Sequence, residues 1–164
     1  MDNQGQDRVY VTMMVDSLKK KEKVLNRLLS ITEKQRDLLK EEKMDADAFD
    51  GLLMEKERAI VELNELDGGF DGLFKLVKKQ IESDREQYRE EIQQMQQLIA
   101  VLSELDVSIR SLESQNNERF KKFLGREKDM IRNYHINNRT ATTYYQNMAN
   151  VHRKENSYFF NEKK

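Results

Sequence analysis

Leucine, isoleucine, valine and methionine recur every three or four positions along most of this chain of 164 residues. That period places apolar side chains on one face of an α-helix. Proline, which would interrupt a helix, does not occur in the sequence. The pattern therefore predicts an all-α fold: an elongated antiparallel helical bundle or coiled coil of three main helices, with a weakly helical C-terminal tail.

The first helix is expected to span about residues 8–42. Its apolar positions are separated by three, four or seven residues, which places them on one face of the helix. They are Val11, Val15, Leu18, Leu25, Leu28 or Leu29, Thr32 and Leu39. The same helix carries a basic run, which is expected to form a solvated face because charge runs usually do. The run consists of Lys19, Lys20, Lys21 and Lys23.

A turn is predicted between the first two helices, around Asp45. The Asp45 side chain can cap the second helix by accepting a hydrogen bond from a backbone N–H of its first turn. Asp47 adds negative charge at the positive end of the helix dipole. Met44 and Phe49 then occupy the two positions that pack together in a hydrophobic staple. The second helix is therefore expected to begin at residue 46.

The second helix is expected to span residues 46–67, because Gly68 and Gly69 follow Asp67 and glycine often ends a helix. A long third helix is predicted over about residues 71–132. Its apolar positions recur about every 3.5 residues, which is the seam of a left-handed coiled coil. Asn116 lies on that seam and would set its register. The alternative is a helix break at residues 114–117, and the spacing does not decide between the two.

Residues 1–132 are thus predicted to form the bundle and residues 133–164 a separate tail, partly disordered or folding on binding. The tail is rich in asparagine and threonine, which are poor helix formers. Its aromatic and apolar residues are typical anchors of protein interfaces and are predicted to bind a partner. They are Tyr134, Ile136, Tyr144, Tyr145, Met148, Val151, Tyr158, Phe159 and Phe160. The alternative is that these side chains pack back on the bundle as core.

Composition excludes several classes of protein. The chain has no cysteine, and therefore no disulfide or thiolate metal site. No signal peptide or run of about 18 apolar residues is seen, so a cytoplasmic location and no membrane insertion are expected. Residues 126–164 contain eight basic and four acidic residues, a charge of +4, which leaves −5 for the rest of the net charge of −1. This asymmetry is too small and dispersed for a nucleic-acid interface.

No catalytic, cofactor-binding or metal-binding residues are predicted, and the chain is not expected to be an enzyme. His135 and His152 have no acidic cluster at ligand spacing. The glycines at positions 68, 69 and 72 lack the lysine and the preceding strand of a phosphate-binding loop.

Two functional classes fit these observations. One is a binding module, a helical export chaperone or adaptor whose tail folds onto another protein. The other is a self-associating structural coiled coil, which the long seam favours. Six aromatic residues in the last thirty-one positions argue against a plain rod. The seam could be satisfied within one chain or between two, which leaves a homodimer open.

The segment from Asp45 to Val77 also carries a family resemblance. It contains Phe49, Leu52, Leu53, Lys56, Ile60, Leu63, Leu66, Asp67, Gly69, Phe70 and Val77. This run resembles the FlgN-type flagellar export chaperones. The order of a long helix, a short polar turn, a helix with a central lysine and a long final helix is similar to that family over roughly residues 9–124.

The resemblance implies a cytoplasmic chaperone for hook–filament junction (hook-associated) proteins of the FlgK/FlgL type. Such a chaperone would capture their amphipathic helices before flagellar assembly and would bring them to the type III export gate. Another helical flagellar or secretion chaperone is the closest alternative.

Overall fold

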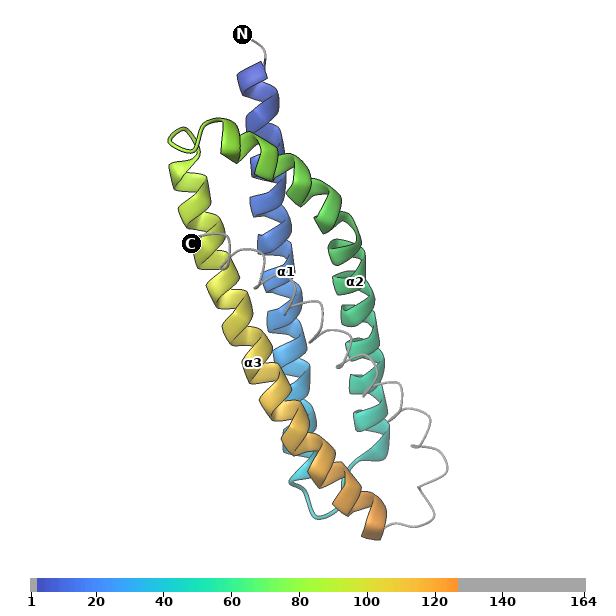
Figure 1. Ribbon diagram of the computed structural model, residues 1–164. Coiled ribbons are helices and arrows are strands. Elements are labelled where there is room, and N and C mark those ends of the chain that lie inside the picture. The colour runs from blue at the N-terminus through green and yellow to red at the C-terminus, as the bar shows by residue number, and fades with distance from the viewer. Residues whose placement is uncertain (1–2, 127–164) are drawn as a thin grey trace.

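The structure is a computed structural model that describes residues 3–126, with side chains described from residue 8 to residue 125. It contains three helices: α1 (Asn3–Leu39), α2 (Ala46–Ser83) and α3 (Arg89–Arg126). Successive helices run in opposite directions and form an elongated bundle (Figure 1). The predicted all-α antiparallel bundle of three main helices is confirmed. The predicted boundary between bundle and tail, at residue 132, lies outside the described residues.

Helix α1 lies between the other two helices. Its Cα atoms come within 8 Å of Cα atoms in both α2 and α3, whereas α2 and α3 do not approach each other this closely within residues 3–126. Because α1 has a neighbouring helix on each of two sides, it buries more residues than those of the predicted apolar stripe. Its further buried residues are Met14, Lys21, Val24, Ile31 and Gln35.

The turn into α2 forms as predicted. Asp45 is the N-cap, and its side chain accepts a hydrogen bond from the backbone N–H of Ala48 at 3.1 Å. Met44 and Phe49 are both buried in one apolar cluster, as the hydrophobic staple requires. The first helix ends at Leu39, slightly earlier than expected, and residues 40–45 connect it to α2.

The predicted end of a helix at Asp67 is wrong. Helix α2 continues through Gly68 and Gly69 to Ser83, and no glycine in the described part of the chain has a positive φ. Beyond Gly69, the side chains of Phe70, Phe74 and Val77 are buried. Burying such side chains outweighs the helix penalty of about 1 kcal/mol for a glycine. Tertiary packing therefore keeps the glycine-rich stretch helical.

The predicted third helix over residues 71–132 is consequently wrong in its first part, because the chain breaks at Asp84. Asp84 leaves the helical conformation, with φ −158° and ψ 86°. Ser83 Oγ donates a hydrogen bond to the carbonyl of Gln80 at 2.6 Å, and Asp84 Oδ1 accepts one from the N–H of Gln87 at 3.4 Å. Such local bonds compete with helix hydrogen bonds. Helix α3 is then continuous to Arg126, so the alternative of a break at residues 114–117 is wrong.

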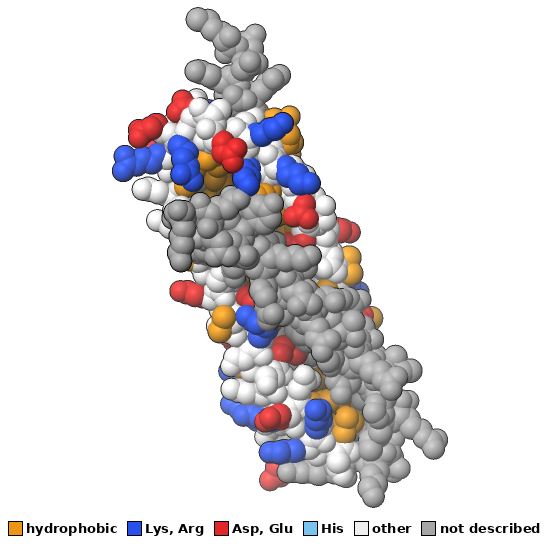
Figure 2. All heavy atoms as spheres, in the orientation of Figure 1, with side chains coloured by type: hydrophobic (Ala, Val, Ile, Leu, Met, Phe, Trp, Pro, Cys, Tyr) orange, Lys and Arg blue, Asp and Glu red, His pale blue; other side chains and the backbone are white. Residues whose placement is uncertain are grey.

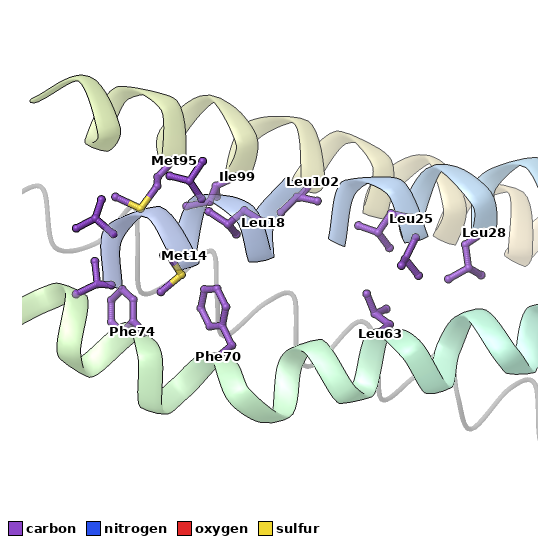
Figure 3. Close-up of a cluster of buried hydrophobic side chains, with 14 of the residues drawn as sticks. Met14, Leu18, Leu25, Leu28, Leu63, Phe70, Phe74, Met95, Ile99 and Leu102 are labelled. Carbon is purple, nitrogen blue, oxygen red and sulfur yellow. The ribbon is translucent and has the colours of Figure 1, made fainter. Parts of the chain in front are cut away.

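The main core runs along both sides of α1. Figure 3 shows Phe70 and Phe74 of α2 on one side of Met14, with Met95 and Ile99 of α3 on the other. All five side chains belong to one buried cluster. A second, smaller cluster closes the end of the bundle where α1 meets α2 and contains Met44, Phe49 and Phe120.

Candidate protein-binding surfaces and buried polar contacts

The residues predicted to bind a partner lie outside the described residues. They are Tyr134, Ile136, Tyr144, Tyr145, Met148, Val151, Tyr158, Phe159 and Phe160. Their role stays a prediction, and so does the alternative that they complete the core.

Within the described residues, the most distinctive chemistry is a buried polar layer that joins all three helices. We define it as Gln35 and Thr32 of α1, Lys56 of α2, and Glu113 and Asn116 of α3. The Lys56 ammonium group donates hydrogen bonds to Gln35 Oε1 and, at 2.5 Å, to Glu113 Oε1. All five residues are buried. A buried charge is tolerated only when it is paired and hydrogen-bonded, and here the pairing requires one particular alignment of the helices.

Asn116 extends this layer along the α1–α3 contact. Its side-chain Nδ2 donates a hydrogen bond to the backbone carbonyl of Thr32 at 3.1 Å. Thr32 Oγ1 in turn donates to the carbonyl of Leu28 at 2.7 Å. A polar residue that finds its partner in only one register specifies that register. The prediction that Asn116 is a polar member of the seam is confirmed.

Burial sets the electrostatics of the layer. Desolvation lowers the pKa of Lys56 below its ordinary value of 10.5, and the nearby Glu113 carboxylate opposes this change. An ammonium group loses hydration when it is buried, which disfavours its charged form. The carboxylate at 2.5 Å compensates for part of that loss. We therefore expect the polar layer to specify the alignment of the helices more than it stabilises the bundle.

A second buried lysine, Lys21, lies on α1, closer to the N-terminus than Thr32 and Gln35. Lys21 Nζ is 2.8 Å from Asp67 Oδ1 of α2 and 5.9 Å from the ring centroid of Phe70. The expectation that the whole run Lys19–Lys23 is solvated is wrong for Lys21, which is 2% exposed. Lys21 lies seven residues before Leu28, on the buried side of the helix. The position of Lys21 on the helix therefore indicated that its side chain is buried, whereas its place in a run of lysines did not.

The aromatic end of the bundle lies where α3 finishes. The rings of Phe49 and Phe120 stack at a centroid distance of 5.3 Å, and Phe123 lies 6.3 Å from Phe120. Phe123 and Leu124 are only partly buried. Partly exposed apolar side chains thus lie next to the point where the chain continues toward Tyr134.

Several large apolar side chains are exposed on the described surface. Met54 and Val61 of α2 are 58% and 49% exposed, and their spacing of seven residues places them on one face of the helix. Val9 and Met13 of α1 are also about half exposed and are four residues apart. Single exposed apolar residues are ordinary on protein surfaces. Pairs at helical spacing are the arrangement that a partner helix contacts.

Charges on the described surface are mixed in sign. Figure 2 shows lysine and arginine side chains interspersed with aspartate and glutamate over the visible described face. One shallow hollow between α1 and α2 has the same mixture, with Lys20, Lys23 and Arg27 facing Glu62 and Glu65. Arg27 pairs with Glu62 at 2.7 Å. This pattern suits protein contacts better than binding of a polyanion.

Two further features of the described residues concern metal binding and membrane insertion. Across residues 3–126, no three side chains of histidine, cysteine, aspartate or glutamate come together as metal ligands would. His135 and His152 lie outside this range. No described helix combines the length and low polarity that crossing a membrane requires.

Sequence reasoning missed the partner of Lys56. Lys56 interrupts an apolar stripe that includes Ile60 and Leu63, and a charge at such a position signals burial with a partner. The identity of that partner could not be read from the sequence. Glu113 lies 57 positions away, and its pairing depends on how α2 and α3 align along α1.

Comparison with known proteins gives one match. Neither the curated proteins nor the solved structures include a significant match to this chain. The FlgN protein family matches residues 11–149, which cover α1 from Val11, all of α2 and α3, and part of the predicted tail. A match of this extent, on a bundle with the predicted order of helices, shows that the chain belongs to the FlgN family of flagellar export chaperones.

Proposed function

We propose that this protein is a cytoplasmic export chaperone that binds hook-associated proteins of the FlgK/FlgL type and presents them to the flagellar export gate. The family match carries this proposal, because it supports a chaperone of flagellar export. An amphipathic helix of the exported protein has an apolar face that is buried only after assembly. The chaperone covers that face in the meantime.

The segment from Tyr134 to Phe160 is proposed as the client-binding site. The family match supports a role for the first part of this segment, because it extends past α3 as far as residue 149. Tyrosine, phenylalanine and methionine bury large apolar areas and are frequent interface anchors. A segment that orders only on binding loses part of its interaction energy to ordering, which permits release at the export gate.

Calorimetric titration with the hook-associated proteins of the same organism tests this function. We expect saturable one-to-one binding with a negative heat-capacity change, the signature of apolar burial. The absence of binding between two folded proteins would contradict the client assignment. A self-associating coiled coil would then be the better interpretation.

A triple variant tests the client site. Tyr144→Ala, Tyr145→Ala and Met148→Ala together should weaken client binding at least about a hundredfold, since truncating an interface anchor often costs about 2 kcal/mol. A matched control is Thr140→Ala, Thr142→Ala and Thr143→Ala, which changes three small polar residues in the same segment. Equal affinities for the two triple variants would place the client site elsewhere.

A further inference from the structure

We propose that the C-terminal segment, residues 127–164, docks on the bundle along the face between α2 and α3 when no client is bound. The docking site consists of side chains that α2 and α3 turn toward each other. A client that binds the aromatic residues of this segment must first release them from the bundle. Docking itself does not depend on the proposed function, whereas the competition with a client rests on it.

Helices α2 and α3 each turn one row of side chains toward the other. Phe49 of α2 stacks on Phe120 of α3. Seven residues further along α2, Lys56 pairs with Glu113, which lies seven residues before Phe120. The same register continues in steps of seven residues along the two antiparallel helices. It defines two facing rows, which we call the α2–α3 seam: Phe49, Lys56, Leu63 and Phe70 of α2 opposite Phe120, Glu113, Asp106 and Ile99 of α3.

The seam is buried although its two helices stay apart. Every seam residue is at most 8% exposed. Within residues 3–126, however, no Cα atom of α2 comes within 8 Å of one in α3, whereas helices that pack directly on each other have axes about 8–10 Å apart. Helix α1 covers the seam from one side, and the other side needs a cover that the three described helices do not supply. The chain that follows α3 is the part of the protein available for this role.

The C-terminal segment has the starting point and the length that such a cover requires. Helix α3 ends at Arg126, at the end of the bundle where α1 connects to α2 (Figure 1). Phe123 and Leu124 are only partly buried at this end, so the apolar surface continues to the point where the segment begins. Residues 127–164 number 38, as many as α2 or α3 contains, so the segment can return along the whole seam. The FlgN family match also continues from the bundle into this segment, as far as residue 149.

The charges of the seam and of the segment are complementary. Asp106 is 2% exposed, and its Oδ2 pairs with Arg110 at 2.9 Å. Its Oδ1 is buried and has no hydrogen-bond partner among the described residues. A buried carboxylate oxygen without a donor is costly, so a cation or an N–H group brought to Asp106 favours docking. Residues 127–164 carry seven basic and four acidic residues, a net charge of +3.

Docking and client binding use the same side chains. The segment contains all the aromatic and apolar residues that are proposed to bind the client, Tyr144 and Tyr145 among them. A side chain that lies against the seam cannot contact the client at the same time. The apparent affinity for a client therefore equals the intrinsic affinity multiplied by the fraction of molecules whose segment is undocked.

Paramagnetic broadening in the full-length protein tests docking. The sequence has no cysteine, so Gln96→Cys places a single nitroxide on α3, three residues before Ile99 and on the same side of the helix. The matched control is Gln97→Cys, because Gln97 is exposed and lies away from the seam, whereas Gln96 is partly buried. Position 96 lies about 45 Å along α3 from Arg126. A residue of the segment therefore approaches it only by returning along the bundle.

The measured quantity is the ratio of each amide signal with the nitroxide oxidised to the same signal with it reduced. We expect this ratio to fall well below one for residues between Tyr134 and Phe160 with the label at position 96, and to stay near one with the label at position 97. Equal ratios for the two labels would overturn docking. Labelled protein mixed with isotope-enriched unlabelled protein checks the occupant. Signal loss in that mixture would show docking on a second copy and would overturn docking within one chain.

Addition of a purified hook-associated protein tests the competition. We expect the ratios of the protein labelled at position 96 to return toward one as the client saturates it. Ratios that stay low in the saturated complex would overturn the competition and leave docking in place. A client that does not bind would contradict the proposed function, and the competition with it, while the ratios of the protein alone still decide docking.

Discussion

Lys56 of α2 donates a hydrogen bond to Glu113 of α3 at 2.5 Å in the interior of the bundle. Within residues 3–126, the Cα atoms of α2 and α3 do not come within 8 Å of each other. The bond passes beside α1, where Gln35 accepts a second hydrogen bond from the same ammonium group. One lysine thus links all three helices at a single level. The consequences for stability can be measured by removing the charges singly and together.

Removing one member of this pair should destabilise the protein strongly. Lys56→Met leaves the Glu113 carboxylate buried without its ammonium partner, and we expect a loss of about 3–5 kcal/mol in the free energy of unfolding. Glu113→Met should have a similar effect for the opposite reason. Urea denaturation followed by circular dichroism measures both values.

The double variant provides the control for this prediction. Lys56→Met with Glu113→Met removes both charges and replaces them by apolar side chains. We expect it to recover most of the lost stability, because paired buried charges are often matched by apolar replacements. Additive losses in the double variant would show that the two residues do not act as a pair.

The pH dependence of stability should also report Lys56. Burial lowers the pKa of Lys56 below 10.5, so between the lowered value and 10.5 the unfolded chain holds a proton that the folded chain lacks. Its contribution to stability is therefore fully present above 10.5 and is lost as pH falls through the lowered pKa. The unmodified protein should therefore become more stable relative to the double variant as pH rises from neutral to about pH 10. A difference that stays constant over this range would contradict the direction of the pKa change.

Lys21 should behave as a core residue despite its place in a basic run. Lys21→Met removes an ion-pair partner of Asp67, which is 13% exposed at its side chain, and we expect a loss of about 1–3 kcal/mol. Lys20→Met is the matched control, because Lys20 is the exposed neighbour and surface changes usually stay within about 0.5 kcal/mol. Thermal unfolding of the two variants checks this. Equal effects would mean that the Lys21–Asp67 contact does not stabilise the folded state.

The cap of α2 can be tested with a conservative pair of substitutions at Asp45. Asp45→Ala removes the acceptor for the Ala48 N–H and should destabilise the protein by about 1 kcal/mol. Asp45→Asn keeps an oxygen at the same place and should change stability by a few tenths of that value. If alanine and asparagine are equivalent in chemical denaturation, the side-chain cap does not contribute.

Truncation after Arg132 distinguishes the two interpretations of the tail aromatics. If the tail serves a partner, residues 1–132 should keep their helical circular dichroism and cooperative unfolding. If the aromatics complete the core, the shortened chain should lose helicity at the same temperature. We expect the first result. Binding of the hook-associated proteins to the shortened chain then shows independently whether the tail is needed.

The sequence predicted the parts of the fold that depend on local periodicity and local capping. Along α3, Met95, Ile109 and Phe120 are buried as the apolar spacing indicated, whereas Leu105 and Leu112 of the same stripe are only partly buried. The Asp45 cap was also predictable, because a cap is a contact between residues three positions apart. Such features need no knowledge of the distant chain.

The errors arose where distant packing overrode a local preference. Gly68 and Gly69 favour a helix end by themselves, but the burial of Phe70 and Phe74 keeps the helix continuous. The break at Asp84 was missed because the apolar period persists across it, from Ile81 to Tyr88. A seven-residue interval is compatible both with one helix and with two helices that share a core.

The central position of α1 has a consequence for synthesis. A ribosome delivers α1 and α2 first, and these two helices can pair through contacts that are close in sequence. The opposite side of α1, which α3 covers in the finished protein, stays uncovered until residues 89–126 have emerged. Newly made α1–α2 hairpins therefore expose an apolar strip to one another. Chains translated from the same messenger RNA are at greatest risk of association during this interval.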